Sequence, residues 1–588
     1  MYYALKEKVY EGMQGLGKGN LASLEDVFLI DDALNVKYIS SNGKEYGDSI
    51  NNKILEDETK IKFASKEFSE YVSKISGVTE EEMKFKWMKN QTSLTIEDSN
   101  IDKLDDLIFF PNLETFTING LQIKNLDGIE NCIKLKTINL SSTSIENFKQ
   151  LSNLNEVTDI QLLYGNNNIK NLIDNIKDLK LKRFSLNYAG GDYDYKIINE
   201  LPISLISLTI RGADNKITKL EGIEKLTNLT ELKADNNNIN TVKGIEKLTK
   251  LTSLNLMNNQ ITEITPLSAN TSLTTLNLKG NSGIDGNRTN YTGEKLEALN
   301  KIGEILDRGG TIFLDIEQLG LFTNYKKLDL ESQNLITLEP LEGLTELTSL
   351  DLYRNKLTLE DEKSQEILKN MTQLELLDLR YNKITNGVAI NSLKNLKYLY
   401  LNGIENNINL ADLEDIISNL IDLKVSSETL KTIVNCDINK ITTLNLGNSV
   451  LTEIPDLSKF IKLTKLNLKS NPNISNFEMV SKITSLKDLN LASNNLHGRM
   501  IDFSKLTNLT NLDLSLNTLW SEDLENLKAL KNNTNLTINL SNNSIIDATA
   551  LLELNPNTKI NLTKNVNLST TSKQALTEYF GKNVTYDK

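Results

Sequence analysis

Residues 222–261 carry the same pattern twice, and this repetition constrains the fold more than any other feature. The hexapeptide Gly-Ile-Glu-Lys-Leu-Thr occupies 222–227 and recurs letter for letter at 244–249. Each copy is followed by Leu-x-x-Leu-x-(Leu/Ala)-x-x-Asn-x-Ile. Repetition at a period of roughly 22 residues predicts a solenoid, in which each unit buries its apolar side chains only against its neighbours.

The spacing of the apolar residues indicates which elements the repeat forms. Leu254 and Leu256 are two residues apart, so in a strand both point to the same side. Stacked strands of this kind form a parallel sheet, and the Asn that follows can bond to backbone groups left open where the chain turns. We therefore predict an α/β repeat fold: a curved leucine-rich-repeat solenoid with a parallel concave sheet, a helical N-terminal cap and a small α+β N-terminal appendage.

The pattern divides the chain into six segments. Residues 27–30 and 36–39 are strand-like, and the Asn42-Gly43 turn signal favours a hairpin. Helical periodicity after residue 61 predicts a cap, in which Thr79 and Glu82 form a capping box. The expected segments are a 1–60 appendage and possible stalk, a 61–92 helical cap, repeat block 1 at 93–284, a 285–315 helix and strand, repeat block 2 at 316–565 and a 566–588 C-terminal cap.

Two interpretations fit the segment 285–315, which interrupts the repeats. It reads as a helix, Gly309-Gly310, a short strand and Asp315. The end of the chain has the same order, with a helix over 572–580, then Gly581, a short strand and Asp587. One hypothesis is that 285–315 is a C-terminal cap retained when a second repeat block was joined. The alternative is a long insertion on the convex side.

Composition narrows the classes of partner. The net charge is −13, with 65 basic and 78 acidic residues. Nucleic-acid binding needs a concentrated basic stripe, which the sequence lacks, so no nucleic-acid partner is expected. The cysteines, Cys132 and Cys436, fall many repeats apart, and we predict that both are free thiols.

No stretch of the sequence has the length and apolarity of a membrane-spanning helix. The N-terminal residues also lack the continuous apolar segment of a signal peptide. Two interpretations follow: a cytoplasmic protein, or a protein whose signal or anchor was removed upstream of Met1.

No catalytic, cofactor-binding or metal-binding constellation is expected. The chain has one histidine, His497, which the pattern places in a turn after a strand. There is no Cys-x-x-Cys pair and no glycine-rich phosphate-binding motif of a nucleotide site. We therefore predict a non-enzymatic protein, with no cofactor, that is monomeric.

The residues flanking the strand leucines should lie on the concave face. Most are small or polar, but three adjacent repeats carry aromatic and basic residues of the types enriched in protein-binding hot spots. They predict one partner-binding patch, made of Tyr353, Arg354, Leu376, Arg380, Tyr381, Tyr398 and Tyr400. The alternative is that these side chains lie scattered along the sheet.

The repeat, with its Gly-Ile-Glu-Lys-Leu-Thr-Asn-Leu-Thr segment, resembles the internalin-like leucine-rich repeats of Gram-positive bacterial surface proteins. The segment 61–101 resembles the cap that precedes such arrays. The resemblance implies an extracellular or cell-surface adhesion protein that binds a protein of a host or neighbouring cell. The chain shows no immunoglobulin-like domain after the repeats and no C-terminal sorting motif, so we expect an N-terminal anchor. A cytoplasmic scaffold that binds an internal protein is the alternative.

Overall fold

The structure is a computed structural model in which the chain forms two compact units, Met1–Leu321 and Phe322–Lys588. It describes residues 60–587, together with the backbone of three short strands nearer the N-terminus. The gaps within that range are 98–99, 121–122, 191–192, 213–216, 404–405, 407, 418, 427–428, 431–440 and 459. Cys436 lies outside the described residues, and so does the short helix that the spacing of Tyr3, Val9, Tyr10, Met13 and Leu16 predicts near the N-terminus.

The N-terminal appendage contains a small antiparallel sheet. Strand β1 (Val27–Ile30) pairs with β2 (Val36–Ile39), and β2 pairs with β3 (Glu45–Tyr46). The β2–β3 hairpin encloses the Asn42-Gly43 turn signal, so the expected strands and hairpin are confirmed.

Two helices cover the first repeat. Helix α2 (Lys66–Ser76) begins at Ser65, whose side chain accepts the Phe68 N–H, and α3 (Phe85–Lys89) follows. Between them lies only a short 3-10 turn, η2 (Glu80–Glu82), where Thr79 makes no side-chain cap bond. The predicted capping box at Thr79 is therefore wrong: the Glu82 N–H, which the Thr79 side chain would accept, donates to the Thr79 carbonyl instead. Aromatic rings of the cap pack edge to face against the first repeats, as Phe68 does against Phe110.

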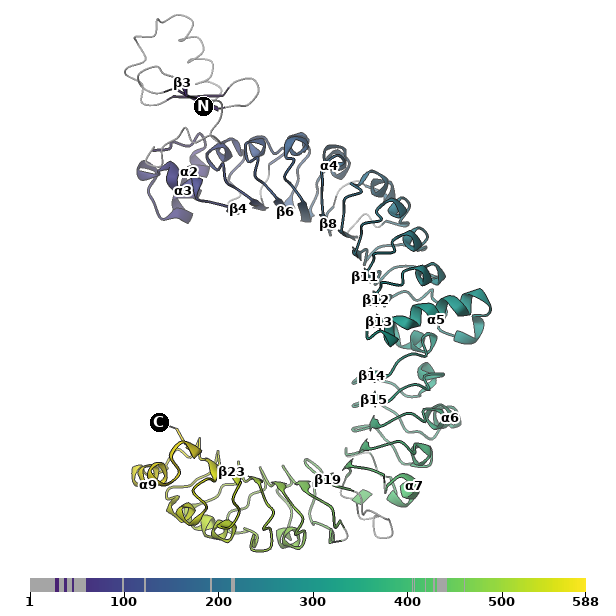
Figure 1. Ribbon diagram of the computed structural model, residues 1–588, viewed down its shortest axis with the longest axis vertical. Coiled ribbons are helices and arrows are strands. Elements are labelled where there is room, and N and C mark those ends of the chain that lie inside the picture. Colours follow the sequence, from purple (N-terminus) through teal and green to yellow (C-terminus); the bar gives the residue numbers. More distant parts are fainter. Residues whose placement is uncertain are drawn as a thin grey trace, which may run out of the picture. The chain divides into compact units, whose positions relative to one another are not determined.

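The first unit contains a ten-stranded, all-parallel sheet with its strands in chain order. The strands lie on the inner side of this unit, and helices α4 (Ile169–Ile176) and α5 (Glu294–Asp307) lie on the outer side (Figure 1). Strand bounds are β4 Ser93–Ile96, β5 Thr115–Asn119, β6 Thr137–Thr143, β7 Asp159–Gly165, β8 Arg183–Asn187, β9 Ser207–Arg211, β10 Glu231–Lys233, β11 Ser253–Asn255, β12 Thr275–Asn277 and β13 Thr311–Phe313.

The second unit contains a twelve-stranded sheet of the same kind. Its helices are α6 (Glu362–Asn370), α7 (Glu414–Ile417) and α9 (Thr570–Phe580). Strand bounds are β14 Lys327–Asp329, β15 Ser349–Asp351, β16 Leu376–Asp378, β17 Tyr398–Tyr400, β18 Asp422–Lys424, β19 Thr443–Asn445, β20 Lys465–Asn467, β21 Asp488–Asn490, β22 Asn511–Asp513, β23 Thr537–Asn539, β24 Lys559–Asn561 and β25 Val584–Thr585.

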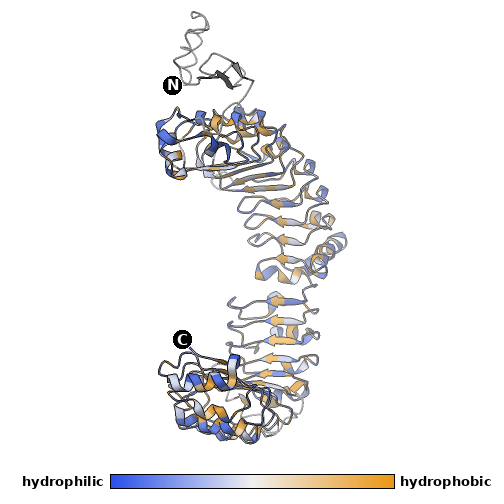
Figure 2. Cartoon of the chain, turned by 60° about the vertical axis from the view of Figure 1, so that its left-hand side comes forward, coloured by the Kyte–Doolittle hydropathy of each residue, from blue (hydrophilic) through white to orange (hydrophobic). Residues whose placement is uncertain are grey.

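Leucines and asparagines hold the repeats in register. Leu232 pairs with Leu254 and Leu254 with Leu276, and all three side chains are buried. Apolar residues run along the strands of both units (Figure 2). Asn259, also buried, accepts the Ile239 N–H at 2.9 Å and donates to the carbonyls of Ala234 and Leu256. The predicted solenoid and the role of the repeat asparagine are confirmed.

The segment 285–315 ends the first sheet in the way that the C-terminus ends the second. Strand β13 pairs with β12, and Asp315 accepts the Gly280 N–H at 2.9 and 3.0 Å. Strand β25 pairs with β24, and Asp587 accepts the Lys564 N–H at 2.5 Å. Gly280 and Lys564 hold the same place in their repeats. No backbone pairing joins β13 to β14 among the described strands. That the segment is a retained cap stays a hypothesis, which this geometry favours.

Candidate functional site

Along the sheet of the second unit, the third residue of almost every strand has a structural task. It is Asn or Asp, and its side chain accepts the backbone N–H two residues later, as Asp351 does from Tyr353 at 2.9 Å and Asn467 from Lys469 at 2.9 Å. Such local bonds stabilise the turn that follows the strand. From β14 to β24, the exceptions are β17 and β18, which carry Tyr400 and Lys424. Tyr400 and Lys424 therefore do not make this local bond.

Tyr400 and Lys424 belong to a row of side chains that alternate between cation and aromatic ring. The Lys424 Nζ lies 3.5 Å from the centroid of the Tyr400 ring, and the Arg380 guanidinium lies 5.7 Å from the same centroid. Arg380 is also 4.8 Å from the centroid of Tyr353, over which Arg354 lies at 5.1 Å. We call these five residues, Arg354, Tyr353, Arg380, Tyr400 and Lys424, the concave ladder.

Tyr381 flanks the concave ladder. Its ring meets Tyr353 edge to face, with centroids 5.4 Å apart, and Arg354 lies 5.9 Å from its centroid. Cation–π contacts of this kind are each worth about 0.5–2 kcal/mol, more where water is excluded. The ladder with Tyr381 thus spans four neighbouring strands, β15 to β18.

Acidic side chains lie beneath the ladder. The Asp378 carboxylate, almost fully buried, accepts from the Arg380 Nε and Nη2, which raises the pKa of Arg380. Tyr400 donates its hydroxyl to Asp422 at 3.3 Å. Burial raises the pKa of both Tyr400 and Asp422 and lowers the pKa of Lys424. Arg380 is therefore fixed in place by its own strand.

Two cations remain open to a partner. Arg354 is exposed and Lys424 half-buried, and neither forms a salt bridge with a described residue. Because partial burial disfavours the charged form of Lys424, an incoming carboxylate would stabilise that charge.

Arg354 and Tyr381 occupy backbone conformations that do not suit them. Both have left-handed φ angles, 54° and 53°. In other repeats of this unit the same place is held by Ser332, Ser470 and Asn542, and in two more by the larger Leu516 and Lys564. A left-handed backbone costs an ordinary L-residue about 1–2 kcal/mol, whereas Asn tolerates it. Strain retained at an exposed residue is a pointer to function.

The structure assembles five of the seven predicted patch residues: Tyr353, Arg354, Arg380, Tyr381 and Tyr400. The other two, Leu376 and Tyr398, are Cα partners at the opposite ends of β16 and β17. Both are half-exposed on the same sheet but outside the ladder.

The sequence analysis missed Lys424, Asp378 and Asp422. A usable signal existed for Lys424, since it replaces an Asn or Asp in the repeat. The two acids carried no such signal, because carboxylates are common throughout the concave positions.

His497 lies between an aromatic ring and a buried carboxylate. Its ring stacks on Trp520, with centroids 4.3 Å apart, and its Nδ1 lies 2.8 Å from the buried Asp523 carboxylate. Asp523 also accepts the backbone N–H groups of Gly498 and Trp520, so it ties two neighbouring repeats together. Within the described part of the chain, no group of three or more His, Cys, Asp or Glu side chains could hold a metal.

Cys132 is buried and, as predicted, is a free thiol. Burial raises the pKa of its thiol. No helix in the described ranges has the length and apolarity that crossing a bilayer requires.

Comparison with solved structures returns leucine-rich-repeat proteins. An internalin (InlF) from Listeria monocytogenes is 25% identical over 62% of this chain and 88% of that chain, with a TM-score of 0.30. The functional domain of InlJ from the same organism is 17% identical over 85% and 80%, with a TM-score of 0.29. TLR13, in a complex with ssRNA13, is 18% identical over 78% and 79%, with a TM-score of 0.47.

The fold is a leucine-rich-repeat solenoid. The expected solenoid is confirmed by the parallel sheets and the buried repeat asparagines of the chain itself, and internalins are among the structures to which the chain is similar. No protein-family model and no curated protein matches the sequence.

Proposed function

We propose that this leucine-rich-repeat protein is a non-enzymatic adhesin that binds a protein partner through the concave ladder. The observation that carries the proposal is the alternation of Arg354, Tyr353, Arg380, Tyr400 and Lys424 across four strands. Tyr and Arg dominate binding hot spots because they combine large contact area with directional polar groups. Arg354 and Lys424 favour a partner segment that presents carboxylates next to apolar side chains.

The residues of the concave ladder and Tyr381 are less favourable for the stability of their own repeats than the residues at the same places elsewhere, and this supports the proposal. Tyr400 and Lys424 forgo the turn bond that Asn or Asp makes in the neighbouring strands, and Arg354 and Tyr381 sit in strained conformations. Four residues of this kind gathered on neighbouring strands fit a surface retained for binding. Leu376 and Tyr398 would extend the same surface toward the other end of the strands.

The expected location is the bacterial cell surface or the medium, where the partner is a protein of a host or neighbouring cell. The alternative is a cytoplasmic scaffold that binds an internal partner. Biotinylation of intact cells with a membrane-impermeant reagent distinguishes the two, because only a surface-exposed protein is labelled before lysis.

The decisive experiment begins with the full chain as bait against solubilised host surface proteins. The captured partner is then purified and its affinity measured by surface plasmon resonance. We expect Tyr398→Ala with Tyr400→Ala to weaken binding at least tenfold, since hot-spot truncations commonly cost 2 kcal/mol or more. The melting temperature should change little. Unchanged affinity in that double variant would remove the patch as the binding surface.

A matched control sits on the same sheet. Thr537 and Lys559 are exposed first residues of β23 and β24, distant from the concave ladder in the repeat order. Thr537→Ala with Lys559→Ala should leave affinity unchanged. Equal losses in both double variants would indicate a general change of the sheet rather than a local hot spot.

A further inference from the structure

A second surface lies on the first unit, where Tyr164 and Tyr188 stack on neighbouring strands. Their ring planes are within 15° of parallel and the centroids are 6.1 Å apart. Tyr164 is 53% exposed, which is high for an aromatic side chain with a stacking partner. The two rings therefore present a flat apolar platform to solvent.

Both tyrosines hold the strained position already described for Tyr381. Their φ angles are 56° and 53°, and the same place in neighbouring repeats is held by Ser142, Asn236 and Asn258. Asn tolerates this conformation far better than Tyr does. The pair is thus retained against local backbone preference, as is expected of a binding platform.

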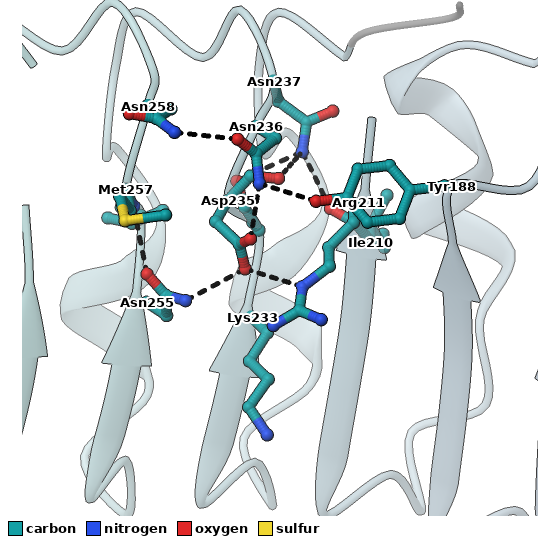
Figure 3. Close-up of polar contacts among 12 residues, drawn as sticks. Tyr188, Ile210, Arg211, Lys233, Asp235, Asn236, Asn237, Asn255, Met257 and Asn258 are labelled. Atoms are coloured by element: carbon teal, nitrogen blue, oxygen red, sulfur yellow. Dashed lines mark hydrogen bonds and ion pairs between the residues drawn. The ribbon is translucent and has the colours of Figure 1, made fainter. Parts of the chain in front are cut away.

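A row of fixed amides continues from the platform. Asn236 donates to the Tyr188 hydroxyl at 3.0 Å, and Asn258 donates to the Asn236 Oδ1 at 2.8 Å (Figure 3). The buried Asp235 carboxylate accepts from Asn236 at 2.8 Å and from Asn255 at 3.0 Å. These bonds fix the amides before any ligand arrives, which lowers the ordering cost of binding.

Hydrogen-bonding capacity remains on this row. The Tyr188 hydroxyl accepts from Asn236, and so its own hydrogen is available to a ligand. Arg211 is held at 3.0 Å by Asp235 through Nε, and among the described residues its two Nη groups have no acceptor (Figure 3). The surface therefore offers several oriented donors beside an aromatic face.

The charges on this surface cancel. Arg211 pairs with Asp235, and Lys233 lies 2.6 Å from Glu231. Among the described residues of this surface, each cation has an acidic partner, in contrast to Arg354 and Lys424 of the concave ladder. An anionic ligand or an acidic protein segment therefore has no electrostatic advantage at this site.

We infer that the Tyr164–Tyr188 platform and its amide row form a binding site for a neutral oligosaccharide. A sugar ring has a face of C–H groups, which packs on an aromatic platform, and a rim of hydroxyls, which bond to amide, phenol and guanidinium groups. The platform and the amide row run across β7 to β11, with strands about 4.8 Å apart, which is long enough for several residues of a glycan chain. This site is separate from the concave ladder, so the two proposals stand or fall independently.

The test is an array of immobilised neutral and acidic oligosaccharides probed with the fluorescently labelled full chain, followed by calorimetric titration of the best neutral ligand. We expect binding to at least one neutral oligosaccharide. Tyr164→Asn alone leaves the Tyr188–Asn236 bond in place, and should weaken binding roughly tenfold. Tyr164→Asn with Tyr188→Asn should abolish it. Asn suits the left-handed backbone, so both variants should fold.

The control is Tyr381→Asn, the equivalent change on the second unit, which should bind the oligosaccharide as the wild type does. Three results would overturn the inference: no neutral oligosaccharide bound, only acidic oligosaccharides bound, or equal binding by the wild type and the double variant. Binding of a protein partner that Tyr164→Asn with Tyr188→Asn abolishes, without any glycan binding, would overturn it in favour of a protein site.

Discussion

The Lys424 ammonium lies 3.5 Å from the centroid of the Tyr400 ring on the neighbouring strand. Tyr400 and Lys424 are each the third residue of their strand. In the neighbouring strands this residue is Asn or Asp, whose side chain accepts a backbone N–H of the turn that follows. The contact thus replaces two local backbone bonds with one pair of side chains on the open face. The contact places an ammonium group and an aromatic ring where a partner can reach both.

Restoring the repeat consensus should separate stability from binding. In the variant Tyr400→Asn with Lys424→Asn, each amide can accept the N–H two residues later, as Asn445 and Asn467 do. Because each regained bond is worth about 0.5–1.5 kcal/mol, the thermal midpoint should stay level or rise. Affinity for the captured partner should fall at least tenfold. Thermal unfolding and surface plasmon resonance measure the two effects, and parallel losses of stability and affinity would contradict the prediction.

Relief of backbone strain should be visible at Tyr164. Tyr164→Asn places a residue that tolerates φ near 56° at an exposed site. The free energy of unfolding should rise by up to about 1 kcal/mol, offset in part by the lost stacking on Tyr188. Urea denaturation measures the change. Asn542→Tyr, at the same place in the second unit, should have the opposite sign.

Replacing a buried repeat asparagine should lower the free energy of unfolding far more than replacing an exposed asparagine. The buried Asn494 accepts the Asn471 N–H at 2.7 Å and donates to the carbonyls of Leu468 and Leu491. Asn494→Ala leaves the buried Asn471 N–H without its acceptor and removes one of the two amide donors to each of the Leu468 and Leu491 carbonyls, so it should cost about 3 kcal/mol. Asn508→Ala, an exposed asparagine bonded only to the Thr484 carbonyl, should cost less than about 1 kcal/mol. Equal losses of the free energy of unfolding in urea denaturation would refute the structural role assigned to the repeat asparagines.

The first unit should fold alone, with Asp315 closing its last repeat. A fragment of residues 1–321 should show a cooperative thermal transition, whereas residues 1–292 lack α5, β13 and Asp315 and should not. Asp315→Ala in the longer fragment removes the acceptor of the Gly280 N–H. That change should lower its midpoint by several degrees. An unfolded 1–321 fragment would contradict the retained-cap hypothesis.

The junction between the helical cap and the first repeats should depend on pH. Asp106 accepts the N–H groups of Ala64 and Ser65, but burial dominates and raises its pKa to about 6. Between the unfolded pKa near 4 and this value, the folded chain binds the proton more readily than the unfolded chain. The stability contributed by protonated Asp106 is therefore full below pH 4 and lost as the pH rises through about 6.

We expect urea denaturation to show that Asp106→Asn loses less stability between pH 4.5 and pH 7 than the wild type does, by at most about 3 kcal/mol. Asp102→Asn, at an exposed position just before the 3-10 helix η3 (Asp105–Phe109) that contains Asp106, should follow the wild type. Identical pH profiles for the wild type and Asp106→Asn would show that Asp106 does not set this dependence.

Much of the architecture could be predicted because it rests on local periodicity. The Leu-x-Leu spacing fixes which side chains enter the core, and Asn259 or Asn494 follows each strand at a set distance. The prediction of a capping box at Thr79 was wrong because of the local backbone conformation. The sequence offers the right residue pair, but the chain makes a single 3-10 turn there and enters α3 only at Phe85.

By itself, the sequence determined the repeat, the direction each strand residue faces, and most of the aromatic and basic residues that break the pattern. Only the tertiary structure decided which of them meet. Stacking at one strand per repeat brings Arg380 between Tyr353 and Tyr400, and Lys424 onto Tyr400, while Leu376 and Tyr398 lie at the other strand ends. It also disclosed the strained backbone at Tyr164 and Tyr188. Contact and backbone strain depend on neighbours in space, which a repeat pattern does not encode.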